Sequence, residues 1–328
     1  MLRIACLFLV IVGSGTGEDA LPGKVVSFGR TFGTDPLPAF DKGYLLYLKH
    51  PADLSVYAPN GLRLFDTTVR DPHGREVRVK SAAIDTDGAI AVASAFSGNQ
   101  SDWIDTGGIA FLDPSGKQTR FVPTGGYRPA GLCFDQEHCL WVVGQGRKND
   151  LLVRKISKDG KEAGAYLPQS LFSGLVFSAG LGLWRVRAAN DRVGLLAYAG
   201  TDHELEWVEL NLEGKLLGRW TLGARKDGGY AYTADGRLYG KSWDENGKPR
   251  LTVFDRSKRS WIPVQDRSGG AGQDLGMHLL LGADQDDLVF ARDGAQLIWL
   301  KPGTVAQAFL PVRPSSEKNE LLGPQRAN

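Results

Sequence analysis

The stretch RPAGLCFDQEHCLWVV, residues 128–143, contains the pattern that decides the fold of this chain. It has two short apolar runs, Ala130 to Phe134 and Cys139 to Val143, on either side of a polar turn. Two apolar runs of strand length around a short polar turn are typical of a β-hairpin. The stretch therefore predicts two antiparallel strands joined at 135–138.

The same kind of turn recurs along the chain. Copies of an Asp/Asn/Gly turn that enters an apolar strand lie at 41–43, 85–88, 190–191, 234–236 and 285–287, about 45 to 54 residues apart. A second turn follows each copy, at 59–61, 114–116, 158–160, 213–214, 257–258 and 302–303. A period of 40 to 50 residues with four strands per unit is the signature of a β-propeller. The sequence thus predicts an all-β fold, a six-bladed β-propeller of four-stranded antiparallel blades, whereas a β-sandwich requires no internal period.

The composition agrees with many tight turns and excludes several classes of protein. Glycine makes up 42 of 328 residues, about 13%, against an average of about 7%. Lys and Arg number 39 and Asp and Glu 37, so the net charge is +2. Such a balance lacks the basic footprint of a nucleic-acid binder or of a membrane-surface protein. We expect no nucleic-acid partner.

The first residues have the organisation of a secretory signal. Met1 to Arg3 is a positively charged lead, Ile4 to Val12 is an apolar run, and 13–17 is a small-residue stretch suited to cleavage. The alternative, a retained anchor, needs about 20 apolar residues. We expect a secreted or periplasmic protein without stable membrane insertion after signal removal. Its expected parts are a signal peptide (1–17), an N-terminal segment with a possible ring-closing strand (18–34), the propeller (35–312) and a flexible tail (313–328).

Two cysteines, Cys133 and Cys139, remain once Cys6 leaves with the signal. An even number in an oxidising compartment favours a disulfide. Because the two residues flank one hairpin turn, we expect them to face each other and to be bonded. Zinc binding and redox activity are the alternatives, but zinc needs two more ligands and the spacing is not Cys-x-x-Cys.

Residues 128–143 resemble the Pro-x-Gly-apolar-x-x-Asp-x-x-Gly-apolar-apolar-x-Val repeat of NHL-type six-bladed propellers. The match is shifted by one residue before Gly131, and His138 stands in place of the turn glycine. Residues 81–93 and 230–239 look like weaker copies. The resemblance, which extends to SMP-30-like and TolB-like propellers, is architectural. It implies a fold and no chemistry, because propellers of this shape host binding modules, lactonases and scaffolds alike.

The two faces of such a propeller differ in their loops. The first and third turns of every blade lie on one face, here called the short-turn face. The middle loops and the links between blades lie on the other, here called the long-loop face, and include 97–107, 144–150, 199–204, 242–249 and 268–278. Varied loops on a rigid scaffold are where binding residues concentrate. We expect binding at the long-loop face.

Candidate contact residues on this face are aromatic or charged. Trp103 and Trp243 fall outside any strand pattern, Asp105 lies beside the first, and His203 lies in another long loop. Aromatic side chains next to carboxylates suit a ligand or partner contact. The alternative is that each tryptophan covers the end of its own blade.

Residues that enter the innermost strands are expected to line the central channel. By register these are Lys80, Arg128, Arg185, Asp227 and His278. Most of them are basic or titrate to a cation, which favours a small anion or a carboxylate-bearing ligand at the channel mouth. The alternative is that these charges are solvated or locally paired.

The sequence contains no familiar catalytic design. The five histidines are isolated, and there is no phosphate-binding P-loop, no GxGxxG between strand and helix, and no GxSxG elbow in the mature chain. SMP-30-type lactonases hold a divalent metal through Glu, Asn and Asp, whereas these strand entries are mainly basic or apolar. We expect no catalytic residues, metal or cofactor, and a monomer that binds an unknown protein or small ligand. The alternative is a channel-mouth hydrolase or lactonase of the SMP-30-like type.

Overall fold

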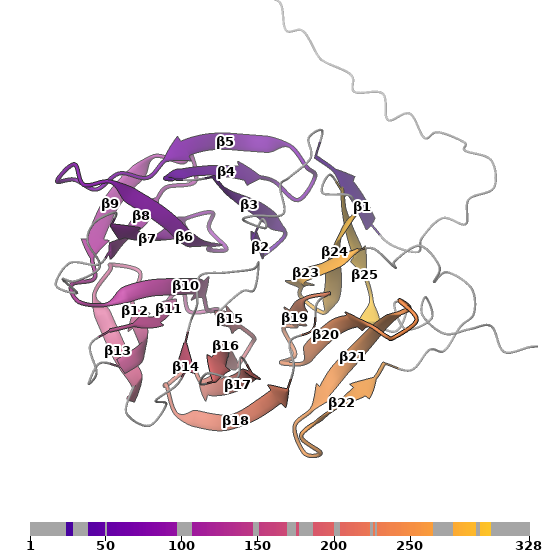
Figure 1. Ribbon diagram of the computed structural model, residues 1–328. Helices are drawn as coiled ribbons and strands as arrows, with labels where there is room; N and C mark the ends of the chain where they lie inside the picture. The colour runs from indigo at the N-terminus through magenta and orange to yellow at the C-terminus, as the bar shows by residue number, and fades with distance from the viewer. Residues whose placement is uncertain are drawn as a thin grey trace, which may run out of the picture.

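The computed structural model describes residues 24–28, 39–49, 51–96, 107–146, 151–168, 175–176, 186–199, 204–223, 226, 228–264, 278–292 and 296–302. The elements in these ranges are all β-strands. Six antiparallel sheets follow one another around a ring (Figure 1), which confirms the predicted six-bladed β-propeller. Within the same ranges, no helix has the length and apolar character needed to span a bilayer.

The first three blades each contain four strands in chain order from the channel outward. Blade one consists of β2 (Ala39–Asp41), β3 (Tyr44–Lys49), β4 (Asp53–Tyr57) and β5 (Arg63–Thr68). Blade two consists of β6 (Val77–Ile84), β7 (Ile90–Phe96), β8 (Gly107–Leu112) and β9 (Gln118–Pro123). Blade three consists of β10 (Arg128–Phe134), β11 (Leu140–Gln145), β12 (Leu151–Ile156) and β13 (Glu162–Pro168).

Blades four to six depart from this plan in two places. In blade four the innermost position is shared by β14 (Leu175–Val176) and β15 (Val186–Ala188), which both pair with β16 (Arg192–Ala199), followed by β17 (Glu204–Asn211) and β18 (Leu216–Gly223). Blade five consists of β19 (Tyr230–Tyr232), β20 (Leu238–Trp243), β21 (Pro249–Asp255) and β22 (Ser260–Pro263). Blade six has β23 (Leu279–Asp284), β24 (Asp287–Arg292) and β25 (Gln296–Leu300) from its own stretch of chain.

The N-terminal strand completes blade six and closes the ring. β1 (Lys24–Ser27) pairs antiparallel with β25, from Lys24 opposite Trp299 to Ser27 opposite Gln296. The turn of blade one fits closely against it: Gly61 has φ +84°, and a Cβ there would lie 2.5 Å from the carbonyl oxygen of Ser27. Residues 305–310, whose sequence VAQAFL also predicts a strand, lie outside the described residues.

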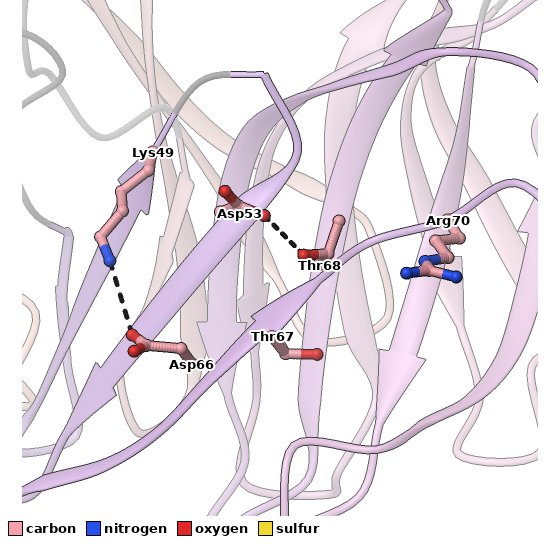
Figure 2. A pocket seen from close by; sticks show the side chains of 6 residues that line it. All are labelled: Lys49, Asp53, Asp66, Thr67, Thr68 and Arg70. Atoms are coloured by element: carbon pink, nitrogen blue, oxygen red, sulfur yellow. Dashed lines mark hydrogen bonds and ion pairs between the residues drawn. The ribbon is translucent and has the colours of Figure 1, made fainter.

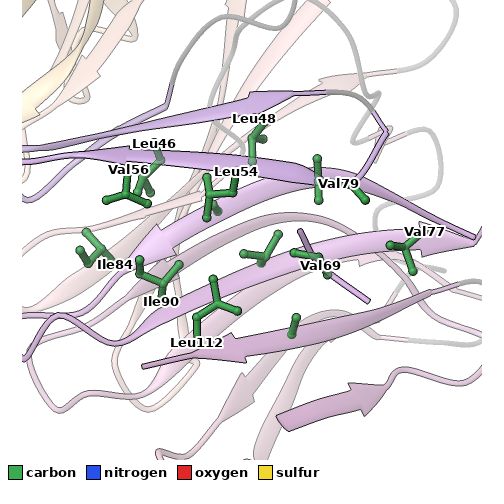
Figure 3. Packing of buried hydrophobic residues seen from close by; sticks show 14 residues of the cluster. Leu46, Leu48, Leu54, Val56, Val69, Val77, Val79, Ile84, Ile90 and Leu112 are labelled. Carbon is green, nitrogen blue, oxygen red and sulfur yellow. The ribbon is translucent and has the colours of Figure 1, made fainter. Parts of the chain in front are cut away.

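The core lies between neighbouring blades. Figure 3 shows the cluster between blades one and two, where apolar side chains of β3 and β4 meet those of β6 and β7. Leu46, Leu54, Val56 and Val92 are fully buried there. Burying such a side chain contributes about 1.5–3 kcal/mol, and equivalent clusters join the other neighbouring pairs. The packed blades therefore form a rigid support for the loops at their ends.

The turns of the short-turn face are satisfied by their own side chains. In blade two, Asp113 Oδ1 accepts the N–H groups of Ser115 and Lys117 at 2.9 and 3.1 Å. In blade four, Asn211 Oδ1 accepts the N–H of Lys215 at 2.7 Å. An Asx side chain that bonds the backbone two to four residues ahead stabilises a tight turn. These turns are folding devices, as their short and uniform sequences predict.

Candidate functional site

The structure describes only part of the residues expected to bind. Trp103, Asp105, Arg185, His203 and Asp227 lie outside the described residues. Arg128, Trp243, His278 and the two cysteines lie within them. The site is therefore built from the channel, from the strand ends of the long-loop face, and from the turns at the opposite end.

The short-turn end of the channel is crossed by Arg187. This residue lies on β15 of blade four, and its Nη2 donates a 2.9 Å hydrogen bond to the carbonyl oxygen of Phe40 on β2 of blade one. Blades one and four stand opposite each other in a ring of six, so the side chain has to reach across the channel. Beside it, Asp41 Oδ2 accepts the N–H of Ile84 in blade two at 3.1 Å.

Asp85 joins three blades at the same end. Its carboxylate is buried and lies 2.9 Å from His138 Nδ1 of blade three and 3.6 Å from Lys42 Nζ of blade one. Lys42 Nζ also donates to the carbonyl oxygen of Phe134, at 3.5 Å. His138 has φ +61°, in the position that a glycine occupies in the turns of blades two and five. The contact with Asp85 thus accompanies a left-handed backbone that favours glycine.

Two cations, Lys80 and Arg128, lie toward the long-loop face and have no acidic partner among the described residues. Lys80 lies on β6 and Arg128 is the first residue of β10, so both are on innermost strands of adjacent blades. Burial lowers the pKa of Lys80, and the positive charges of Arg128 and Arg78 lower it further. Within the described ranges, neither Lys80 nor Arg128 forms an ion pair or a side-chain hydrogen bond.

Lys241, which no local sequence pattern marks as functional, brings His278 and Trp243 together. Lys241 is fully buried, its Nζ donates to the carbonyl oxygen of His278, and it lies 4.4 Å from the centre of the Trp243 ring. Burial lowers the pKa of Lys241 to about 8. His278 is only 3% exposed, so its ring is not the accessible channel-mouth group expected from the sequence. Trp243 is partly buried and covers the lysine.

A polar pocket opens at the long-loop end of blade one (Figure 2). It has a volume of about 550 Å³ and is lined by Lys49, Asp53, Asp66, Thr67, Thr68 and Arg70. Thr68 Oγ1 donates to Asp53 Oδ1 at 2.6 Å, and Lys49 Nζ lies 3.5 Å from Asp66 Oδ1. The backbone of Arg70 is held by the amide of Gln118, through bonds of 3.0 and 2.8 Å. Among the described residues, the Arg70 guanidinium has no carboxylate partner.

The expected disulfide is absent from the structure, where Cys133 and Cys139 are both free thiols. The reason is the register of the hairpin. Cys133 pairs with Trp141, whereas Cys139 lies opposite Asp135, whose N–H donates to the Cys139 carbonyl at 3.0 Å. Two residues on each strand separate the cysteines from direct opposition. Burial raises the pKa of both thiols, and Asp135 raises that of Cys139 further.

One group of possible metal-ligand atoms occurs in the described part of the chain. Atoms of Asp135, Glu137 and Cys139, in the first turn of blade three, lie within 4.8 Å of one another. Lys155 Nζ lies 3.5 Å from the Asp135 carboxylate and 3.3 Å from that of Glu137. Asp135 also accepts the indole N–H of Trp141 at 2.8 Å. An ammonium group already balances these carboxylates, so we interpret the group as part of the turn.

Comparison with known proteins gives no information on the site. No protein-family model matches the chain, and no curated protein matches it. Similar solved structures include the Dos1 propeller, with a TM-score of 0.46 and 10% identity over 81% of this chain and 78% of that one. They also include selenomethionine-substituted virginiamycin B lyase from Staphylococcus aureus, with a TM-score of 0.40 and 12% identity over 84% and 98%.

Proposed function

We propose that this chain is an exported, non-catalytic propeller that binds a ligand or protein partner through its long-loop face. The observation that carries the proposal is the contrast between the two ends of the blades. The described turns of the short-turn face form hydrogen bonds within themselves, and Arg187 and Lys42 are bound by groups of other blades. The long-loop end has a pocket and the cations Lys80, Arg128 and Arg70 without acidic partners among the described residues.

The physical argument concerns Lys80 and Arg128, which are partly buried, and not Arg70, which is exposed. A charged group that is partly removed from water loses solvation, and a nearby like charge adds repulsion. A protein keeps such an arrangement at functional sites more often than elsewhere. Export is supported by the apolar run and small-residue stretch of 1–17.

Binding is favoured over the hydrolase alternative by the kind of side chain at the channel mouth. A lactonase of the SMP-30 type needs oxygen and amide ligands for a divalent cation, whereas Lys80 and Arg128 would repel one. The acidic group at Asp135 lies on the short-turn face and contacts Lys155.

A pair of photo-crosslinking sites tests the proposal. A photoreactive amino acid is placed at Asn246, exposed in the β20–β21 turn of the long-loop face, and at Ser115, exposed in the β8–β9 turn of the short-turn face. The mature protein is then irradiated in the native exported fraction. We expect a discrete adduct from position 246 and none from position 115. Adducts from position 115 alone, or turnover of lactones that a chelator abolishes, would contradict the proposal.

A further inference from the structure

The long-loop half of the channel contains a β-bulge with a lysine as its extra residue. In blade two, Val79 pairs with Ser94 and Ser81 with Ala93, so Lys80 has no partner on β7. The innermost strands of blades three and six have bulges at the same place, where Ala130 and Leu281 are the extra residues. Bulges often re-aim a side chain beside a functional site. Of these three bulges, the one in blade two carries a charge.

Arginines flank this lysine at matching positions of two blades. Arg78 stands two residues before the bulge in β6, and Arg128 stands two residues before the bulge in β10. Both are close enough to Lys80 for their charges to disfavour its protonated form. The three side chains therefore share one region at the boundary between blades two and three.

Several partly buried cations of the described residues are paired with carboxylates. Arg75 makes two hydrogen bonds to the carboxylate of Asp71, at 2.8 and 3.0 Å. Lys155 contacts Asp135, and Lys42 contacts Asp85. The carboxylates of Asp41 and Asp85 lie toward the opposite end of the channel and have partners of their own. Asp41 accepts the N–H of Ile84, and Asp85 contacts Lys42 and His138. Lys80 and Arg128 thus differ from these paired cations.

Obstruction at the other end makes the site one-sided. Arg187 crosses the short-turn end of the channel to Phe40, so we take the long-loop face as the side from which a ligand reaches Lys80. Low-dielectric walls lined by one sign of charge concentrate the field and raise the local concentration of counter-ions.

We infer that the channel mouth between blades two and three is a binding site for a small oxyanion, held by Lys80 and Arg128. The inference rests on the proposed function and names the ligand class for its binding face. Two cations on adjacent strands suit a group with two or more acceptor oxygens, a feature that carboxylates and phosphates share. Phosphate esters and small dicarboxylates are the two sources of this chemistry.

Calorimetric titration and thermal unfolding at constant ionic strength test the inference on the mature protein. The probes are inorganic phosphate and succinate, with chloride as the reference anion. The variants are Lys80→Gln and Arg128→Gln, and the control is Arg63→Gln, which removes an exposed cation paired with Asp66 on the outer strand of blade one. We expect phosphate or succinate to bind and to raise the Tm of the wild type and of the control.

Each channel variant should bind the preferred probe at least about tenfold more weakly, because a hydrogen bond to a charged group is worth about 1.5–3 kcal/mol. Lys80→Gln should also leave the anion-free protein as stable as the wild type or more stable, since it removes a repulsion. A preference for phosphate or for succinate identifies the source. The inference is wrong if neither probe binds, or if the channel variants bind as the wild type does. Crosslinks from position 246 without anion binding would leave the proposed function standing.

Discussion

The phenol of Tyr232 in blade five donates a 2.8 Å hydrogen bond to Oε1 of Glu209 in blade four. Arg256 also donates to both oxygens of this buried carboxylate, and Arg192 lies 3.7 Å from it. Glu209 therefore connects two blades through charged and neutral donors at once. Burial raises the pKa of Tyr232, as does the negative charge of Glu209, so the phenol stays a donor at ordinary pH.

Removal of Glu209 should destabilise the protein strongly. We expect Glu209→Ala to lower the free energy of unfolding by about 3 kcal/mol, because it removes the buried carboxylate that pairs with the partly buried Arg256 and accepts from the Tyr232 phenol. Tyr232→Phe should cost about 1 kcal/mol. Urea unfolding measures both. Glu213→Ala, in the exposed turn after the same strand, is the control and should stay within about 0.5 kcal/mol. A small effect of Glu209→Ala would mean that the network does not hold blades four and five together.

Asp71 should make stability depend on pH in the acid range. Hydrogen bonds from Arg75 hold the pKa of Asp71 below its usual value of 3.8. A lowered pKa in the folded state gives a stabilisation that is present above the unfolded-state pKa and lost as the pH falls through the folded-state pKa. We expect Asp71→Asn to cost about 1.5–3 kcal/mol at pH 6.

The cost of Asp71→Asn should shrink as the pH drops below 3.8. Urea unfolding at a series of pH values checks this trend. Glu76→Gln, which changes an exposed neighbour, should run parallel to the wild type. A cost that is constant from pH 6 to pH 2 would refute the role of the Asp71 charge.

His138 and Asp85 should be energetically coupled. His138→Gly relieves a left-handed backbone, which costs a non-glycine residue about 1–3 kcal/mol, but it removes the contact with Asp85. We expect the single variant to change stability little, because the two effects oppose each other. A double-mutant cycle with Asp85→Asn should show a coupling of about 0.5–3 kcal/mol. Additive effects would show that the contact between blades two and three contributes nothing.

The cysteines should be chemically free. Mass spectrometry of denatured, unreduced protein after alkylation should find both Cys133 and Cys139 modified. In the native state Cys139 should react slowly and Cys133 more slowly still, because burial raises the pKa of each thiol. A protein that is not alkylated and whose mass is two hydrogens below that of the dithiol form would show that the disulfide predicted from the sequence is present.

The number of blades and the position of their turns were predictable because each turn repeats the same chemistry at a regular spacing. The positions of individual side chains were harder to predict from the sequence. His278 stands immediately before β23 and Tyr127 immediately before β10, and both are buried. Glu76 stands in the same position before β6 and is exposed, so the position along the chain does not decide burial. The prediction of a disulfide was wrong because the presence of a hairpin turn does not by itself determine which residues lie opposite each other.

Arg187 and Lys241 were not selected from the sequence for a different reason. β15 has three residues and no alternating pattern, so nothing local indicates that Arg187 crosses to blade one. Lys241 sits in a strand whose other members read as core, and its partner is a backbone carbonyl that has no sequence signal. Contacts between blades depend on the packing of the ring as a whole.

The pairing of β1 with β25 has a consequence for the order of events during biosynthesis. β1 is synthesised before the strands of all six blades, but its partner β25 is among the last strands to be made. The pairing of Lys24 with Trp299 therefore forms only after the rest of the propeller has been synthesised. Contacts of such sequence separation form slowly. Until then β1 lacks its partner strand and remains open to pairing with another chain. Newly made chains are thus exposed to misassembly for the whole of their synthesis, and the last step of folding removes that risk.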